Sequence, residues 1–119
     1  MEHINILIVE DKTEQSERLK EILQEHNFNV VGIAASFQEA VKMYQTTHID
    51  LAIIDIFLSE HPEGISFAEF IDVQPNAKPF IFLTSAVSRD IFNRAKLTKP
   101  FSYIIKPYNQ LELIYAIET

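Results

Sequence analysis

Short apolar runs alternate along the chain with longer segments in which apolar residues recur at helical spacing. The apolar runs are rich in Ile, Val and Phe. Polar residues do not alternate with apolar ones inside most of them, which is typical of strands that are covered on both faces. The predicted strands cover residues 4–10, 28–35, 50–55, 79–84 and 101–106.

The segments after the first two strands predict amphipathic helices. One helix is expected over residues 11–26, where charged residues separate the apolar positions. The next is expected to open at Ser36, because Ser36 and Glu39 form a capping-box pattern. The inner faces are expected to carry Leu19, Ile22 and Leu23 in the first helix, and Phe37, Ala40, Val41 and Tyr44 in the second.

The third and fourth predicted strands are also followed by helices. The segment 59–64, SEHPEG, is a loop by its turn residues, and a short helix is predicted after it over residues 65–72. A further helix is predicted over residues 88–97, capped by Ser88 or Ser85.

The last helix is predicted to open at Asn109, because Asn109 and Glu112 mimic a capping box. It follows the fifth predicted strand directly. Its inward-facing residues are expected to be Leu111, Ile114, Tyr115 and Ile117.

Five predicted strands thus alternate with five predicted helices. This alternation indicates the α/β class, with a doubly wound parallel sheet and helices on both faces. Right-handed crossovers leave few ways of winding such a sheet. The 119 residues are enough for one domain and too few for two, so a single domain over residues 1–119 is expected.

Polar side chains stand at the carboxyl ends of four of these strands. Glu10 and Asp11 end the first strand, Asp55 ends the third, Thr84 ends the fourth and Lys106 ends the fifth. In open α/β sheets, ligands bind beyond the carboxyl ends of the strands, where the winding direction switches. If the first and third strands are neighbours, three carboxylates meet at this edge.

Three carboxylates close together are unstable unless they take up protons or hold a cation. Oxygen ligands without His or Cys suit Mg²⁺, which often bridges to a phosphate. Lys106 adds a positive charge that suits an anion, and Thr84 adds a hydroxyl donor. Together these groups can neutralise a phosphoryl group placed on Asp55.

Composition and charge narrow the function classes. The net charge is −7, and no basic cluster stands out, which argues against direct nucleic-acid binding. The chain has no cysteine, which excludes disulfides and thiolate metal sites. Neither a signal-peptide pattern nor an apolar run long enough to span a bilayer is present. A soluble cytoplasmic domain is therefore expected.

The segments ILIVED, DLAIIDIFL, IFLTS and YIIKP occur in this order, each at a strand's carboxyl end. In these segments, and over its whole length, the chain resembles the receiver domain of two-component response regulators. The resemblance implies the flavodoxin-like receiver fold, with strand order 2-1-3-4-5. It also implies a signalling protein that is not an enzyme, apart from self-phosphorylation and autodephosphorylation.

The resemblance implies a role for each polar residue. Asp55 would be the phosphoacceptor, taking a phosphoryl group from the phosphohistidine of a sensor histidine kinase or a phosphotransfer protein. Glu10 and Asp11 would hold Mg²⁺ together with Asp55 and the backbone carbonyl of Phe57. Lys106 would contact the phosphoryl oxygens.

A conformational switch is also implied. Thr84 would move its hydroxyl toward the phosphate, and Tyr103 would turn inward to fill the vacated space. Lys106 and Pro107 would be joined by a cis peptide bond, which X–Pro bonds adopt at low cost. The acyl phosphate would bias two nearly balanced conformations, and the signalling surface would comprise the fourth predicted helix, the fifth strand and the fifth helix.

One departure from the family pattern concerns the loop after Asp55. The family commonly has Pro a few residues after the phosphoacceptor. Here Ser59 stands nearer that place and Pro62 comes later, so the loop to Gly64 is slightly long.

Simpler interpretations of single residues remain open. Asp55 could cap the turn that follows it, and Glu10 could be a solvated acid that favours the start of a helix. Thr84 could be an ordinary hydroxyl at a strand end, and Tyr103 could belong to the core.

Other functions compete with the phosphorylation switch. One alternative is a degenerate receiver that binds partners without phosphorylation. A phosphatase with an Asp nucleophile would want a second Asp where Phe57 stands, and Phe57 cannot protonate a leaving group. A nucleotide-binding protein lacks support, because Gly32 and Gly64 are the only glycines and leave no phosphate-cradling loop.

The partners follow from the resemblance. A sensor histidine kinase or a phosphotransfer protein is the expected phosphoryl donor, and no membrane contact is expected. The chain could stand alone or be the first domain of a longer regulator with a C-terminal output domain. A homodimer through the fourth helix, fifth strand and fifth helix is a further hypothesis.

Overall fold

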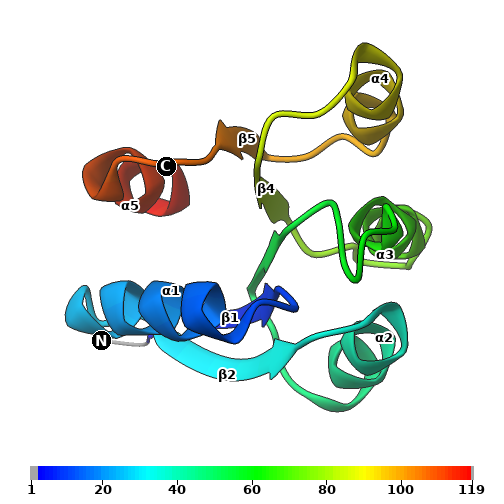
Figure 1. Ribbon diagram of the computed structural model, residues 1–119. Coiled ribbons are helices and arrows are strands. Elements are labelled where there is room, and N and C mark those ends of the chain that lie inside the picture. Colours follow the sequence, from blue (N-terminus) through cyan, green and yellow to red (C-terminus); the bar gives the residue numbers. More distant parts are fainter. Residues whose placement is uncertain (1–2, 119) are drawn as a thin grey trace.

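The computed structural model describes residues 3–118, and the sheet that they form has five parallel strands (Figure 1). The strand order is β2-β1-β3-β4-β5, as predicted. The predicted domain span 1–119 includes residues 1, 2 and 119, which lie outside the described residues. The strands are β1 (Asn5–Val9), β2 (Asn29–Ala34), β3 (Leu51–Ile54), β4 (Phe80–Thr84) and β5 (Ser102–Ile105).

Helices cover both faces of this sheet. In Figure 1, α1 and α5 lie on one side, and α2, α3 and α4 lie on the other. This two-sided cover explains why the strand sequences are apolar without alternation. The helices are α1 (Thr13–Glu25), α2 (Phe37–Thr46), α3 (Glu63–Asp72), α4 (Arg89–Leu97) and α5 (Gln110–Glu118).

Two helix starts differ from their predictions. Helix α1 begins at Thr13, because Glu10 and Asp11 belong to the loop that follows β1. Helix α3 begins at Glu63 instead of residue 65, so the predicted loop is shorter at its carboxyl end. Ile65 N donates to Pro62 O at 3.1 Å, which closes the first turn of α3.

The helix caps largely follow the sequence pattern. Ser88 caps α4 by accepting from Ile91 N at 3.3 Å. Ser36 caps α2 in the same way, accepting from Glu39 N at 3.2 Å. Asn109 Oδ1 accepts from two backbone amides at the start of α5, those of Leu111 at 2.8 Å and Glu112 at 3.2 Å.

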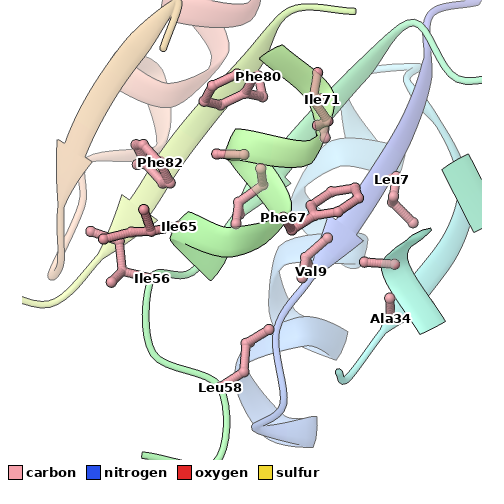
Figure 2. Packing of buried hydrophobic residues seen from close by; sticks show 14 of the residues in the cluster. Leu7, Val9, Ala34, Ile56, Leu58, Ile65, Phe67, Ile71, Phe80 and Phe82 are labelled. Atoms are coloured by element: carbon pink, nitrogen blue, oxygen red, sulfur yellow. The ribbon is translucent and has the colours of Figure 1, made fainter. Parts of the chain in front are cut away.

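The hydrophobic core consists of two layers, one on each face of the sheet. Strand β1 contributes to both, because alternate side chains of a strand point to opposite faces: Leu7 and Val9 face α2 and α3, whereas Ile6 and Ile8 face α1 and α5. Phe67 and Phe82 are the largest fully buried side chains. Figure 2 shows Phe67 pointing from α3 toward the sheet.

The inward face of α5 was predicted incorrectly for two residues. Leu111 and Tyr115 are 52% and 60% exposed. The buried residues of α5 are Leu113, Ile114 and Ile117, which pack on the layer beside α1. The run LELIY carries apolar residues on most sides of the helix, so its pattern does not set which side faces inward.

No helix within residues 3–118 combines the length and the apolar character that crossing a bilayer requires.

All five strands run in the same direction, so their carboxyl ends meet at one edge of the sheet.

Candidate functional site

The backbone ladder continues one residue beyond the strands and places the polar residues side by side. Asp55 N donates to Val9 O at 2.9 Å, which joins the ends of β1 and β3. Lys106 N donates to Thr84 O at 2.8 Å, which joins the ends of β4 and β5. The register of the parallel sheet therefore places the backbones of Asp55, Thr84 and Lys106 at the same edge.

Both carboxylate oxygens of Asp55 are hydrogen-bonded, and the residue is only 7% exposed. Thr84 Oγ donates to Asp55 Oδ1 at 2.7 Å. Lys106 Nζ donates to Asp55 Oδ2 at 3.1 Å. A buried carboxylate is costly without such partners, so one hydroxyl and one ammonium group make this position tolerable.

The ammonium group of Lys106 has three acceptors, one for each of its N–H bonds. Besides Asp55, they are Glu10 Oε1 at 2.7 Å and the side-chain oxygen of Gln15 in α1. Burial lowers the pKa of Lys106, but the hydrogen bond to Glu10 and the charge of Asp55 outweigh this effect and raise it overall. The lysine is therefore held as a cation.

Glu10 is 5% exposed and shares Lys106 with Asp55. Its Oε2 also accepts from Lys12 N at 3.3 Å. Burial raises the pKa of Glu10, and the negative charge of Asp55 adds to this, while the hydrogen bond from Lys106 lowers it in part. The carboxyl group of Glu10 thus binds a proton more readily than a carboxyl group in water.

Asp11 contacts the loop that follows β3. Ser59 N donates to Asp11 Oδ2 at 2.8 Å. The other oxygen, Oδ1, is buried and accepts no hydrogen bond from any described residue. The exposed ammonium group of Lys12 is 3.9 Å from this oxygen, which is an ion-pair contact but too long for a hydrogen bond.

The three predicted metal-ligating carboxylates are divided between two arrangements. Glu10 and Asp55 share Lys106, whereas Asp11 is held by Ser59. Within residues 3–118, no three His, Asp or Glu side chains converge closely enough to hold a metal ion. The donors are nevertheless all oxygens, and the buried Oδ1 of Asp11 accepts no hydrogen bond from the described residues, so these residues fit Mg²⁺ in their chemistry.

Thr84, Phe57 and Tyr103 connect the site to the core. Thr84 is 1% exposed, and its hydroxyl also accepts from Ile56 N at 3.4 Å. The half-buried side chain of Phe57 packs against the core layer beside α3.

Tyr103 is half-buried, and its ring packs edge-on against Phe82 and Phe92, with centroids 5.9 and 5.0 Å away. Burial, with a smaller effect from the charge of Asp55, raises the pKa of Tyr103. The peptide bond between Lys106 and Pro107 is cis.

Gly64 allows the start of α3 to lie against the backbone of Asp55. Its N–H donates to Ile56 O at 2.9 Å. A Cβ atom at residue 64 would lie 1.9 Å from Asp55 O, a distance that no side chain can occupy. Gly64 therefore allows α3 to pack directly against the backbone of Asp55 and Ile56.

Gln15, Ser59 and Gly64 contribute contacts that the sequence pattern did not assign. Gln15 lies in the first turn of α1, four residues after Asp11. This short distance along the chain was the one signal in the sequence that Gln15 lies near the acidic residues. The departure in loop length pointed to the region of Ser59 and Gly64 without showing what either residue contacts.

A cleft of about 600 Å³ opens beside Lys106, between α1 and the turn that follows β5. Its lining includes the apolar residues Ile8, Ile53 and Leu83, together with Arg18 and Tyr108. The buried carboxylate of Asp55 borders this cleft, which gives a ligand a direction of approach.

The chain is similar in sequence to known proteins of one family. The family model described as the response regulator receiver domain matches residues 6–118. The chain is 34% identical over 113 residues to the transcriptional regulatory protein PdtaR of Mycobacterium tuberculosis, covering 95% of this chain and 54% of that protein. It is 27% identical over 113 residues to the chemotaxis protein CheY of Thermotoga maritima, covering 94% of this chain and 92% of CheY.

Solved structures show the same fold. The signal receiver domain of a modulated diguanylate cyclase from Desulfovibrio desulfuricans G20 aligns with a TM-score of 0.90 and 32% identity, covering 98% of this chain and 92% of that one. A CheY-like receiver domain protein from Methanospirillum hungatei aligns with a TM-score of 0.89 and 26% identity, covering 98% and 92%. The chain spans about half the length of the first curated relatives that it matches.

Proposed function

The chain belongs to the response regulator receiver domain family, and from this premise we propose that it is a phosphorylation-dependent switch in which Asp55 is the phosphoacceptor. Receiver domains are signalling proteins of two-component systems, and phosphorylation is their general means of switching. They interact with histidine kinases or phosphotransfer proteins. For this chain, the phosphoryl donor is proposed to be the phosphohistidine of such a protein.

The observation that carries the proposal is the pairing of Asp55. Its two oxygens are bound by different groups, a hydroxyl from β4 and an ammonium from the residue after β5. A carboxylate that only capped a turn would not require a partly buried lysine shared with a second acid. This arrangement supports a group whose charge changes during function.

The transfer step is an in-line displacement at phosphorus. A carboxylate oxygen of Asp55 forms the new P–O bond, while the bond from phosphorus to the donor nitrogen breaks and the imidazole leaves with the electron pair. Lys106 offsets the charge of the phosphoryl oxygens. The Thr84 hydroxyl, which now donates to Asp55 Oδ1, transfers its hydrogen bond to a phosphoryl oxygen.

Receiver domains generally bind Mg²⁺. In this chain, we assign its binding to the carboxylates of Asp11, Glu10 and Asp55 and to the backbone carbonyl of Phe57. When bound, the ion would neutralise negative charge on the phosphoryl group. Asp11 Oδ1 is the donor with free lone pairs, while Glu10 and Asp55 would have to give up part of their contact with Lys106.

The switch is proposed to run from Thr84 to Tyr103. Both residues lie on neighbouring strands, and Tyr103 contacts Phe92 of α4. Movement of the Thr84 hydroxyl would change the space that the Tyr103 ring can occupy and bias the face formed by α4, β5 and α5. This face is the proposed signalling surface, and a homodimer through it is proposed as one readout.

Phosphorylation can be tested with acetyl phosphate, which here supplies the phosphoryl group in place of a kinase. The purified protein is incubated with acetyl phosphate and Mg²⁺ and then weighed intact. We expect one phosphoryl adduct in the wild type and none in Asp55→Asn. Asp50→Asn is the matched control: Asp50 lies at the other end of β3, and it should keep the adduct.

The same experiment distinguishes the degenerate receiver, the alternative function. This alternative is favoured by one observation, namely that within residues 3–118 the three acids do not converge on a common metal position. Absence of the adduct in the wild type, with no binding of Mg²⁺, would favour the alternative. Sustained release of phosphate from many esters would instead point to a phosphatase.

A C-terminal output domain is proposed because the chain spans about half of the curated relatives that it matches. A cytoplasmic location is proposed on the basis of the same signalling function. Neither proposal is needed for the chemistry at Asp55.

A further inference from the structure

A two-residue hairpin lies between Asp55 and the start of α3. Leu58 N donates to His61 O at 2.8 Å, and His61 N donates to Leu58 O at 3.1 Å. The two residues at its tip, Ser59 and Glu60, have positive φ angles of 52° and 67°, which is the pattern of a type I′ turn. Gly, Asn and Asp usually fill these positions, so Ser and Glu adopt this turn at a conformational cost.

The base of the hairpin is fixed in the core. Leu58 is 1% exposed, and Phe57 packs against the same core layer. The tip is exposed, yet the Ser59 amide reaches Asp11, a residue 48 positions earlier in the chain. The strained turn thus directs one backbone N–H at a carboxylate that ends another strand.

This contact leaves Asp11 with two different oxygens. Oδ2 is bound to Ser59 N at 2.8 Å, whereas Oδ1 is buried and accepts no hydrogen bond within residues 3–118. A carboxylate held by one oxygen cannot rotate freely, so the orientation of the other oxygen is set. The ammonium group of Lys12 lies 3.9 Å from Oδ1, too far for a hydrogen bond. A buried carboxylate oxygen that accepts no hydrogen bond is costly unless a ligand binds it.

We infer that Ser59 is a positioning residue, whose backbone N–H holds Asp11 so that Asp11 Oδ1 is presented to the divalent cation. This inference rests on the proposed function, because it assigns the cation to Asp11. Hydrogen bonds that orient a metal-ligating carboxylate typically change metal affinity by 10- to 100-fold when they are removed. The Ser59 side chain has no part in this contact.

The test removes one N–H without removing a side chain. The amide that joins Leu58 and Ser59 is replaced by an ester, so that residue 59 has an oxygen in place of its N–H. The matched control is the same replacement at Glu60, whose N–H reaches no acceptor within residues 3–118. A second control is Ser59→Gly, which keeps the N–H and suits the positive φ angle.

Isothermal titration with MgCl₂ measures the affinity, and thermal unfolding without metal measures the stability of each variant. We expect the dissociation constant for Mg²⁺ to rise about tenfold or more in the ester at residue 59. In the ester at residue 60 and in Ser59→Gly it should stay within about twofold of the wild type. A purely structural role would lower the unfolding temperature and leave the dissociation constant unchanged.

Wild-type affinity in the ester at residue 59 would overturn the inference and leave the proposed function intact. Equal losses in the two esters would also overturn it, because Ser59 would then have no special role. Failure of the wild type to bind Mg²⁺ would remove both the metal assignment and the inference. The intact-mass experiment with acetyl phosphate judges the phosphoacceptor independently of these results.

Discussion

Thr84 and Asp55 form a buried side-chain pair in which the hydroxyl donates to the carboxylate at 2.7 Å. Replacing Thr84 by Val keeps the shape and removes the donor, so Asp55 Oδ1 loses its partner. We expect the free energy of unfolding to fall by about 1–3 kcal/mol, measured by urea denaturation. Thr84→Ser keeps the hydroxyl, and its loss should be smaller; an equal loss in both variants would assign the effect to the methyl group instead.

The two glycines of the chain should respond differently to Ala. At Gly64 the new Cβ would meet the rigid backbone of Asp55 at 1.9 Å. At Gly32 it would meet the flexible end of Met43 at 2.9 Å. We expect Gly64→Ala to lower the free energy of unfolding by about 1–3 kcal/mol or more.

Gly32→Ala should change the free energy of unfolding by less than about 1 kcal/mol, because Met is flexible and can move. Urea denaturation of both variants makes the comparison. A similar loss at the two positions would contradict the close approach of α3 to Asp55.

The turn at Ser59 and Glu60 should become more stable with residues that favour positive φ angles. Glu60 has φ of 67° and is exposed, so Glu60→Gly removes strain without removing a buried contact. We expect an increase of about 1 kcal/mol in the free energy of unfolding. Glu60→Ala is the control, since Ala does not relieve the strain, and a gain in both variants would attribute the effect to the lost charge.

The raised pKa of Tyr103 predicts that the free energy of unfolding depends on pH in the alkaline range. Burial first, and then the charge of Asp55, raise its pKa above the usual 10.0. A group whose pKa is higher in the folded state contributes stability that is fully present below the unfolded pKa and is lost as the pH rises through the folded pKa. The wild type should therefore lose more stability than Tyr103→Phe between about pH 9 and about pH 11.

Urea midpoints at these two pH values provide the measurement. Tyr108, whose pKa is also raised with burial as its largest cause, is present in both proteins and cancels in the comparison. If the urea midpoint falls equally in the two proteins, folding does not change the pKa of Tyr103.

Two leucines of α5 test which side of that helix faces inward. Leu113 is fully buried, so Leu113→Ala should cost about 2–5 kcal/mol in the free energy of unfolding. Leu111 is 52% exposed, and Leu111→Ala should cost less than about 0.5 kcal/mol. Denaturation curves that rank the two variants in the opposite order would reverse the assignment of the buried face.

The strands and the caps at Ser36 and Ser88 could be predicted because they depend on local patterns. General rules of winding only narrowed the strand order, and the resemblance to receiver domains supplied it. The orientation of α5 could not be predicted, because apolar residues surround that helix and only packing against β5 and α1 selects a face. The start of α3 depended on a turn at Pro62 that no periodicity reveals.

The candidate site divides in the same way. Asp55, Thr84 and Lys106 could be placed together, because carboxyl ends of parallel strands share an edge. The partners of Asp11 could not be predicted. They depend on a hairpin whose residues do not favour its conformation, and on a contact between residues 48 positions apart.

The position of Lys106 late in the chain has a consequence for folding order. Its two acid partners, Glu10 and Asp55, precede it by 96 and 51 residues. On a ribosome, both acids emerge well before the lysine that compensates their charge. The first four strands can associate earlier, but the acidic edge stays uncompensated until β5 docks beside β4. The ion pairs of Lys106 with Glu10 and Asp55 therefore form only when the last strand joins the sheet.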